Sequence, residues 1–236
     1  MQKVYYDLHI HTCLSPCGDV DSTPNNVVNM AKIKGLDVIA ITDHNSIGNV
    51  EACVKVGEKV GLTVIPGMEL TTAEEVHIVC LFKTLNNANL FWQEVEKRQP
   101  KIKNREEIFG EQVFLDENDE EIKREERLLI VATTIGVYDV VNLVNKFGGV
   151  CYPAHIDRTS NGILAILGGM DKDMGFEFAE VSRKAKNVQE LNPLGLKILR
   201  ASDAHHIGHI FEMEEADSVE ISSLDIDCVF KALFNK

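Results

Sequence analysis

Several features are scarce or missing in this sequence, and each absence argues against a class of protein. The 236-residue chain has six scattered cysteines and no Cys-x-x-Cys pair, which disfavours a disulfide framework. No apolar run has the length of a membrane span, and no cationic segment with an apolar run opens the chain, so we expect a cytoplasmic protein without a membrane partner. Glycine-rich Gly-x-Gly-x-x-Gly and Walker loops are also missing.

Positive charge is scarce as well. The chain has 24 lysines and arginines against 37 aspartates and glutamates, for a formal net charge of −13. An acidic surface repels phosphate backbones, so this balance disfavours an extended nucleic acid as a partner. A small phosphorylated substrate stays compatible, because bound metal ions reverse the local field. The composition does not predict an oligomeric state.

Short apolar strands alternate with amphipathic helices along most of the chain. The strand candidates are residues 5–10, 37–42, 63–65, 76–82, 150–154, 177–181, 197–202 and 218–221. Helices between successive strands imply parallel pairing, and this many units predict a closed or nearly closed α/β barrel. We expect a single domain over residues 1–236. A charged stretch near residues 101–127 breaks the rhythm and predicts a hairpin-like insertion.

Histidines and carboxylates recur where the predicted strands end. His9 and His11 lie two residues apart and share one face of the first strand, so both imidazoles can reach one metal ion. The other strand-end residues are Asp43, His44, Glu69, His155, Asp203 and His205, whereas His77 opens its strand. One strand histidine alone is more often an ordinary polar residue. Because function collects at the carboxyl-terminal mouth of a barrel, the joint pattern predicts a metal centre there.

Five ordered segments resemble motifs of the PHP (polymerase and histidinol phosphatase) superfamily. They are Asp-Leu-His-Ile-His-Thr, Ile-Thr-Asp-His-Asn, Gly-Met-Glu-Leu, Pro-Ala-His and Ser-Asp-Ala-His. The resemblance runs from residue 4 to about residue 210, which is nearly the whole chain. It implies a distorted (β/α)7 barrel whose carboxyl-terminal mouth holds two or three divalent ions of manganese, iron or zinc. It also implies hydrolysis of phosphoesters.

Matched positions in the resemblance imply nine metal ligands: His9, His11, Asp19, His44, Glu69, His77, His155, Asp203 and His205. The ligand from the loop after His11 is open, because relatives carry Asp or His five or six residues beyond this histidine. Here those positions are Pro16 and Cys17. We favour Asp19 over Cys17, since the loop looks lengthened. A carboxylate suits manganese or iron, whereas a thiolate favours zinc.

Three residues are expected to act in catalysis. Glu69 would bridge two ions, and Asp43 would accept a hydrogen bond from an imidazole N–H. Arg158 would form a bidentate hydrogen bond with a substrate phosphate. A strand-end turn and a surface ion pair are the competing interpretations of Asp43 and Arg158. We expect metal-activated water to attack a small phosphate monoester or a nucleotide-like phosphoester. The alternatives are an exonuclease-type phosphodiesterase acting on nucleic-acid ends and a non-catalytic metal- or partner-binding module.

Overall fold

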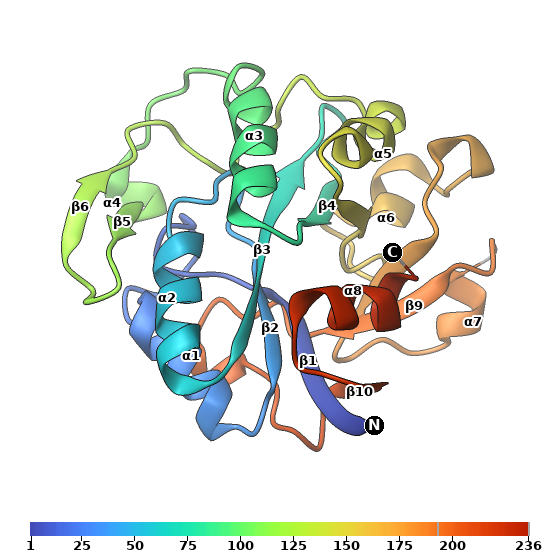
Figure 1. Cartoon of the computed structure of the whole chain (residues 1–236). Helices are drawn as coiled ribbons and strands as arrows, with labels where there is room; N and C mark the ends of the chain where they lie inside the picture. The colour runs from blue at the N-terminus through green and yellow to red at the C-terminus, as the bar shows by residue number, and fades with distance from the viewer. Residues whose placement is uncertain (193, 236) are drawn as a thin grey trace.

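A curled six-stranded sheet organises a mixed α/β fold with the form of a half-barrel (Figure 1). The computed structural model describes residues 1–192 and 194–235. The order of the strands in the sheet is β10-β1-β2-β3-β4-β7. These strands are β1 (Gln2–Ile10), β2 (Val38–Ile41), β3 (Thr63–Thr71), β4 (His77–Leu81), β7 (Val150–Pro153) and β10 (Asp217–Ile221). Two separate pairs are β5 (Val113–Leu115) with β6 (Glu121–Arg124), and β8 (Phe178–Ser182) with β9 (Lys197–Ala201).

The sheet has mixed strand directions, so the expectation of parallel pairing throughout is wrong. β1 and β2 pair in parallel, as do β2 and β3, but β4 is antiparallel to both β3 and β7. The reason is the link between β3 and β4, which is a tight turn closed by the Thr72 amide donating to the Val76 carbonyl at 2.9 Å. This reversal pairs His77 with Thr71 and places the start of β4 beside the carboxyl end of β3.

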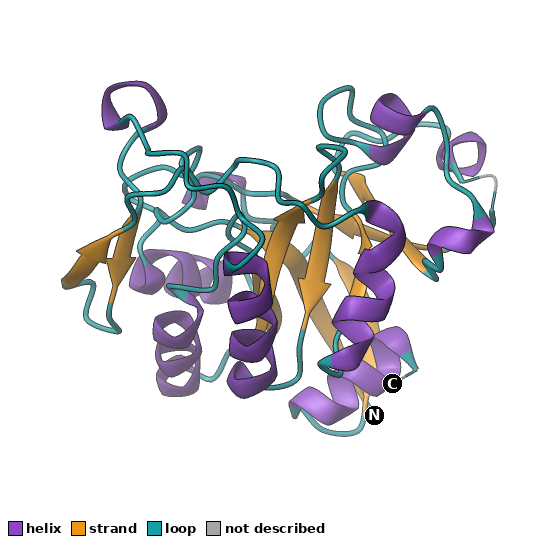
Figure 2. Ribbon diagram, turned by 90° about the horizontal axis from the view of Figure 1, so that it is seen from above, coloured by secondary structure: helices purple, strands orange, loops and turns teal. Residues whose placement is uncertain are grey.

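Amphipathic helices cover the sheet. The longer ones are α1 (Pro24–Ile33), α2 (Val50–Val60), α3 (Leu85–Glu96), α5 (Val137–Lys146) and α8 (Ile226–Phe234). The shorter ones are α4 (Glu106–Phe109), α6 (Ile163–Leu167) and α7 (Val188–Leu191). Figure 2 shows helices packed along the strands and long loops gathered at one end of the molecule. In the described part of the chain, every helix is too short or too polar to span a lipid bilayer.

Alternating residues of the strands build two apolar clusters. In β2, Ile39 and Ile41 join the cluster that contains buried residues of α1, α2, α3 and α5. Val38 and Ala40 join the other cluster, to which α8 contributes Phe230 and three further residues. This period of two is what a strand buried on both faces requires, and it makes the strands a rigid support for the residues at their ends.

The segment 101–127 carries α4 and the antiparallel β5–β6 ribbon, seen at one edge of the molecule in Figure 1. Phe114 of β5 packs on Leu14, which belongs to the loop after β1. Asp119 at the tip of the ribbon accepts hydrogen bonds from Thr23 and Asn25 at the start of α1. These contacts fasten the ribbon to the main fold, and we propose that it is an insertion within one domain.

Candidate metal centre

Strand ends that are distant in sequence meet at one buried centre. Backbone hydrogen bonds run from His11 N to Ala204 O at 2.9 Å and from Ala204 N to His9 O at 3.3 Å. They bring the end of β9 against the end of β1, so that Asp203 lies beside both histidines. The same centre receives Glu69, whose amide donates to Asp43 O at 3.1 Å. Main-chain pairing therefore places the ligand residues next to one another.

Glu69 lies in the middle of the cluster and is 1% exposed. Its carboxylate oxygens lie within 3.4 Å of five histidines: His9, His11, His44, His77 and His155. Oε1 is 2.9 Å from His77 Nδ1, and Oε2 is 3.0 Å from His44 Nδ1. Burial raises the pKa of this carboxyl group, but the charges of His77, His9 and His44 outweigh burial and hold the pKa well below its ordinary value. Glu69 is therefore an anion at neutral pH that faces two groups of imidazoles.

Asp203 is the second buried carboxylate of the cluster. Its Oδ1 lies 3.3 Å from His9 Nε2 and 3.2 Å from His11 Nε2, while its Oδ2 contacts the Arg158 guanidinium. His205 Nδ1 lies 3.4 Å from the same Oδ1. Burial raises the pKa of Asp203, but the neighbouring His9 and His11 lower it by more. The net pKa is therefore far below the ordinary value.

Two ligand positions have unusual backbone conformations. His155 has φ of 31° and Asp203 has φ of 50°, although neither is glycine. Non-glycine residues adopt positive φ at a cost of roughly 1–3 kcal/mol when the surroundings demand it. At these positions the chain turns sharply after β7 and β9, which directs both side chains into the centre instead of along the strand.

Glu180 was not among the predicted site residues. It lies in β8, is 0% exposed, and its Oε1 is 3.0 Å from His9 Nδ1. The same oxygen accepts a hydrogen bond from the amide of His155 at 3.2 Å. A glutamate is rarely fully buried without a partner, so its place in the apolar run Phe-Ala-Glu-Val was the available signal. Its contacts orient His9 with Nε2 toward Asp203 and Glu69.

Asp43 supports the centre indirectly. It accepts hydrogen bonds from Thr12 N at 2.8 Å and from Thr12 Oγ1 and Ser15 Oγ at 2.7 Å each. Ser15 Oγ in turn lies 2.9 Å from His11 Nδ1. The direct imidazole contact expected for Asp43 is replaced by this relay through Ser15, because the loop after β1 folds between the two residues.

The loop after β1 brings a thiol, not a carboxylate, to the histidines. Cys17 Sγ lies 3.2 Å from His44 Nε2. Asp19 instead accepts the amide of Asp21 at 2.9 Å, and within residues 1–192 and 194–235 its carboxylate forms no ion pair with a histidine. The ligand role expected for Asp19 therefore stays a prediction.

The donor set fits divalent metal ions. Within the described residues, three overlapping groups have ligand atoms within 4.8 Å of one another: His11 with His44 and His205, His9 with His11 and Glu69, and His44 with Glu69 and His77. Among the buried polar atoms that lack a hydrogen bond are His77 Nε2, His155 Nδ1 and Asp203 Oδ1. Buried polar atoms without partners are rare in proteins, and imidazole with carboxylate is a donor set for transition metals.

Two cavities open onto the cluster. One, of about 180 Å³, is lined by Cys17, Ile130, Ser160, Asn161 and Arg158 together with most of the ligands. The other, of about 510 Å³, is lined by Arg158, Ser182, Arg183, Lys184, Ser202, Asp203 and His209, and we call it the cationic groove. Arg158 and Asp203 belong to both, so the groove begins at the ligands themselves. Arg183 is held in place by donating to His209 O at 2.7 Å.

Comparison with known proteins identifies relatives of this arrangement. A model of the PHP domain family matches residues 7–217. An uncharacterized protein of Methanocaldococcus jannaschii is 43% identical over 77 residues, which are 29% of this chain and 44% of that protein. A 5'-3' exoribonuclease of Haemophilus influenzae is 34% identical over 79 residues, which are 32% of this chain and 28% of that protein. The chain thus matches less than half the length of these curated relatives.

Solved structures share the fold at low sequence identity. The lesion-specific endonuclease Q of Pyrococcus furiosus superposes with a TM-score of 0.73 at 16% identity, covering 99% of this chain and 56% of that one. An endonuclease Q bound to a 27-mer duplex with an abasic lesion gives 0.71 at 17% identity, covering 98% and 56%. A metal-dependent phosphoesterase from Bifidobacterium adolescentis gives 0.60 at 19% identity, covering 97% and 95%.

These neighbours correct the expected partner. The sequence predicted a small phosphorylated substrate and disfavoured nucleic acid, yet endonuclease Q, which has this fold, binds a 27-mer duplex substrate. Net charge was the wrong measure because it sums over the whole surface, whereas binding depends on the field at one place. In this chain Arg158, Arg183 and Lys184 gather at the cationic groove despite the total of −13.

Proposed function

Because this chain belongs to the PHP domain family of metal-dependent phosphoester hydrolases, we propose that it cleaves phosphodiester bonds in nucleic-acid strands. The cationic groove is the observation that carries this proposal. It is too large for one phosphate group, with a volume of about 510 Å³, and three of its lining residues are cations. A strand that enters the centre would lay its neighbouring phosphate along this groove, whereas a small monoester would occupy only the part beside Arg158.

Eight residues of the cluster would hold the metal ions: His9, His11, His44, Glu69, His77, His155, Asp203 and His205. We propose two or three divalent ions of manganese, iron or zinc at the carboxyl-terminal mouth of a distorted (β/α)7 barrel. When bound, such ions supply Lewis acidity at a phosphoryl oxygen and lower the pKa of a water molecule.

Arg158 would position the reacting phosphate. Its guanidinium pairs with Asp203 Oδ2 and is shared by both cavities, so it lies between the ligands and the cationic groove. A guanidinium presents parallel N–H donors that match two oxygens of a phosphate group. Part of the side chain is exposed, and incoming phosphate would take over donors that now face Asp203. Arg183 and Lys184 would then bind the next phosphate of the strand.

A panel of substrates tests this proposal. Protein loaded with manganese or zinc is incubated with end-labelled single-stranded DNA, RNA and duplex DNA, and with p-nitrophenyl phosphate and a mononucleotide. We expect cleavage of at least one strand, with much slower hydrolysis of both monoesters. Product lengths separate removal of terminal nucleotides from internal cleavage, and the alternative of action at nucleic-acid ends predicts the former. Rapid hydrolysis of monoesters with no strand cleaved would overturn the proposal.

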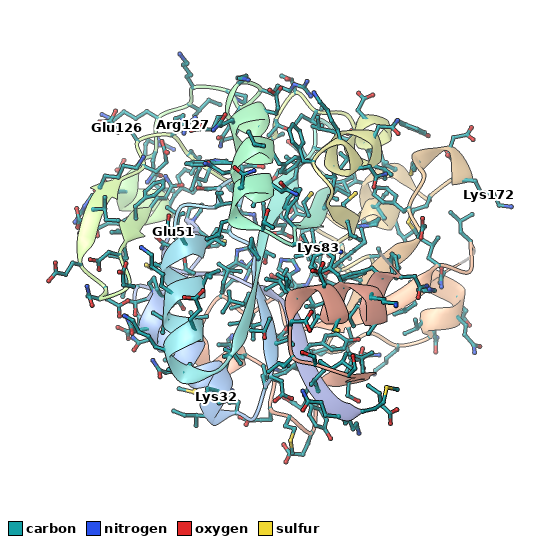
Figure 3. All side chains as sticks on the ribbon, viewed as in Figure 1. Lys32, Glu51, Lys83, Glu126, Arg127 and Lys172 are labelled. Carbon is teal, nitrogen blue, oxygen red and sulfur yellow. The ribbon has the colours of Figure 1, made fainter. Side chains whose placement is uncertain are left out.

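A matched pair of variants links the activity to the groove. Lys184→Gln removes a cation that lines the groove. Lys83→Gln removes a cation just after β4 that is not among the residues lining the groove; Lys83 is labelled in Figure 3. We expect weaker binding of oligonucleotides in the Lys184 variant and unchanged binding in the Lys83 variant. Equal behaviour of the two variants would remove the groove from the binding surface.

A further inference from the structure

We propose that the thiolate of Cys17 is a metal ligand of this centre, paired with His44, and that it gives one ion a mixed nitrogen and sulfur environment that selects zinc. Cys17 Sγ lies 3.2 Å from His44 Nε2. Zinc binds sulfur at about 2.3 Å and imidazole nitrogen at about 2.0–2.1 Å, so two such donors on one tetrahedral ion lie about 3.5 Å apart. The observed separation needs little adjustment to receive an ion. This inference concerns the metal centre and does not depend on which phosphoester is cleaved.

His44 is turned so that its two ring nitrogens serve different partners. Nδ1 lies 3.0 Å from Glu69 Oε2, and Nε2 faces Cys17. The ring is 2% exposed, so this orientation is fixed by packing. His11 and His205 offer ring nitrogens within 4.8 Å of one on His44. This side of the centre is thus rich in imidazoles, and a thiolate added to them makes a softer donor set than the carboxylate-rich side around Asp203.

The loop holds Cys17 in this place through its backbone. Gly18 N donates to Ser15 O at 2.8 Å, and Asp19 N donates to His205 O at 2.8 Å. A Cβ on Gly18 would lie 2.2 Å from the carbonyl oxygen of Thr12, so the turn accepts only glycine. Thr12 and Ser15 are themselves anchored on Asp43. The thiol is therefore presented to the centre by a tied loop.

Cobalt substitution tests the proposal without measuring activity. Cobalt(II) replaces zinc in such sites, and a thiolate ligand gives it a near-ultraviolet charge-transfer band that imidazole and carboxylate ligands do not give. We expect this band in the cobalt-loaded protein, its loss in Cys17→Ser, and its retention in Cys228→Ser. Cys228 is the matched control because it is a partly exposed free thiol on α8. Absence of the band in the cobalt-loaded wild type, or its persistence in Cys17→Ser, would overturn the proposal.

Two further measurements guard against a trivial loss of the site. Cys17→Asp restores a donor at the same position, so we expect this variant to bind cobalt without the charge-transfer band and to keep the circular dichroism of the wild type. Zinc should also slow alkylation of Cys17 by iodoacetamide, measured by peptide mass spectrometry, while leaving the rate at Cys228 unchanged. Equal alkylation of Cys17 in the zinc-loaded and metal-free proteins would contradict the assignment, whatever the phosphodiesterase assays show.

Discussion

The Nε2 atoms of His9 and His11 face each other at 3.1 Å in the buried centre. Glu180 lies beside Nδ1 of His9. Ser15 lies beside Nδ1 of His11 and donates its own hydroxyl proton to Asp43. When these partners hold the Nδ1 protons, both facing Nε2 atoms are bare lone pairs that repel each other. Only a cation between the rings or a proton on one of them relieves this repulsion. The support residues thus leave the pair suited to hold either a proton or a metal ion between the rings.

Replacement of Glu69 tests the middle of the cluster. Glu69→Gln keeps the shape of the side chain but removes the charge that faces five histidines. We expect metal affinity and phosphoesterase activity to fall by about 100-fold or more, since even supporting partners of ligands contribute 10–100-fold. Isothermal titration with manganese and a strand-cleavage assay measure the two effects. Glu51→Gln, at an exposed position on α2 labelled in Figure 3, is the control and should behave as wild type.

Glu180 is expected to act as a positioning residue. Glu180→Gln removes the acceptor that holds His9, so its Nε2 is no longer fixed toward Asp203 and Glu69. We predict a fall of about 10–100-fold in metal affinity. Raising the metal concentration should restore most of the activity, a rescue that damage to the fold would not show. Glu177→Gln, an exposed neighbour three residues earlier, should leave metal affinity unchanged.

Salt dependence reports on the cationic groove. Each lysine or arginine that neutralises a phosphate contributes roughly one unit to the slope of log affinity against log salt concentration. Lys184→Gln is expected to weaken oligonucleotide binding and to reduce that slope by about one unit. Fluorescence anisotropy at several salt concentrations measures both. An unchanged slope would mean that Lys184 does not touch the strand.

The metal-free protein should lose stability as the pH rises. Burial lowers the pKa of His11, but Asp203 and Glu69 outweigh burial and raise it to about 9. A raised folded-state pKa contributes stability that is complete below the unfolded value of about 6.5 and disappears as pH passes about 9. The free energy of unfolding of the metal-free protein should therefore fall across this interval. Urea unfolding at pH 6.5, 8 and 9 measures it, and His11→Gln should flatten the trend.

Bound metal should remove much of that pH dependence. The ions replace the proton on the imidazole pair, and binding to the folded state alone stabilises it by about 2.7 kcal/mol at 100 times the dissociation constant. We expect a higher midpoint of thermal unfolding with manganese or zinc than after chelation, with the largest difference near pH 9. Identical midpoints with and without metal would contradict a structural metal centre.

Short-range pattern determined much of this protein. His9 and His11 share a strand face because side chains alternate, and strand ends carry the other ligands because the chain turns there. Such local rules need no knowledge of distant contacts, which is why the family motifs, the mixed α/β class and the convergence of histidines and carboxylates could be predicted. A strand buried on both faces also appears in sequence as a continuous apolar run, as residues 38–41 do.

Tertiary structure decided what depends on residues far apart in the chain. The direction of β4 followed from a tight turn, and it explains why His77 reaches the centre although it begins its strand. Glu180 became a site residue only through contact with His9, 171 residues away. Cys17 rather than Asp19 reached His44 because backbone hydrogen bonds set the path of the loop. The cationic groove arose from folding too, because net charge is a property of composition, whereas an electrostatic field depends on where each charge is placed.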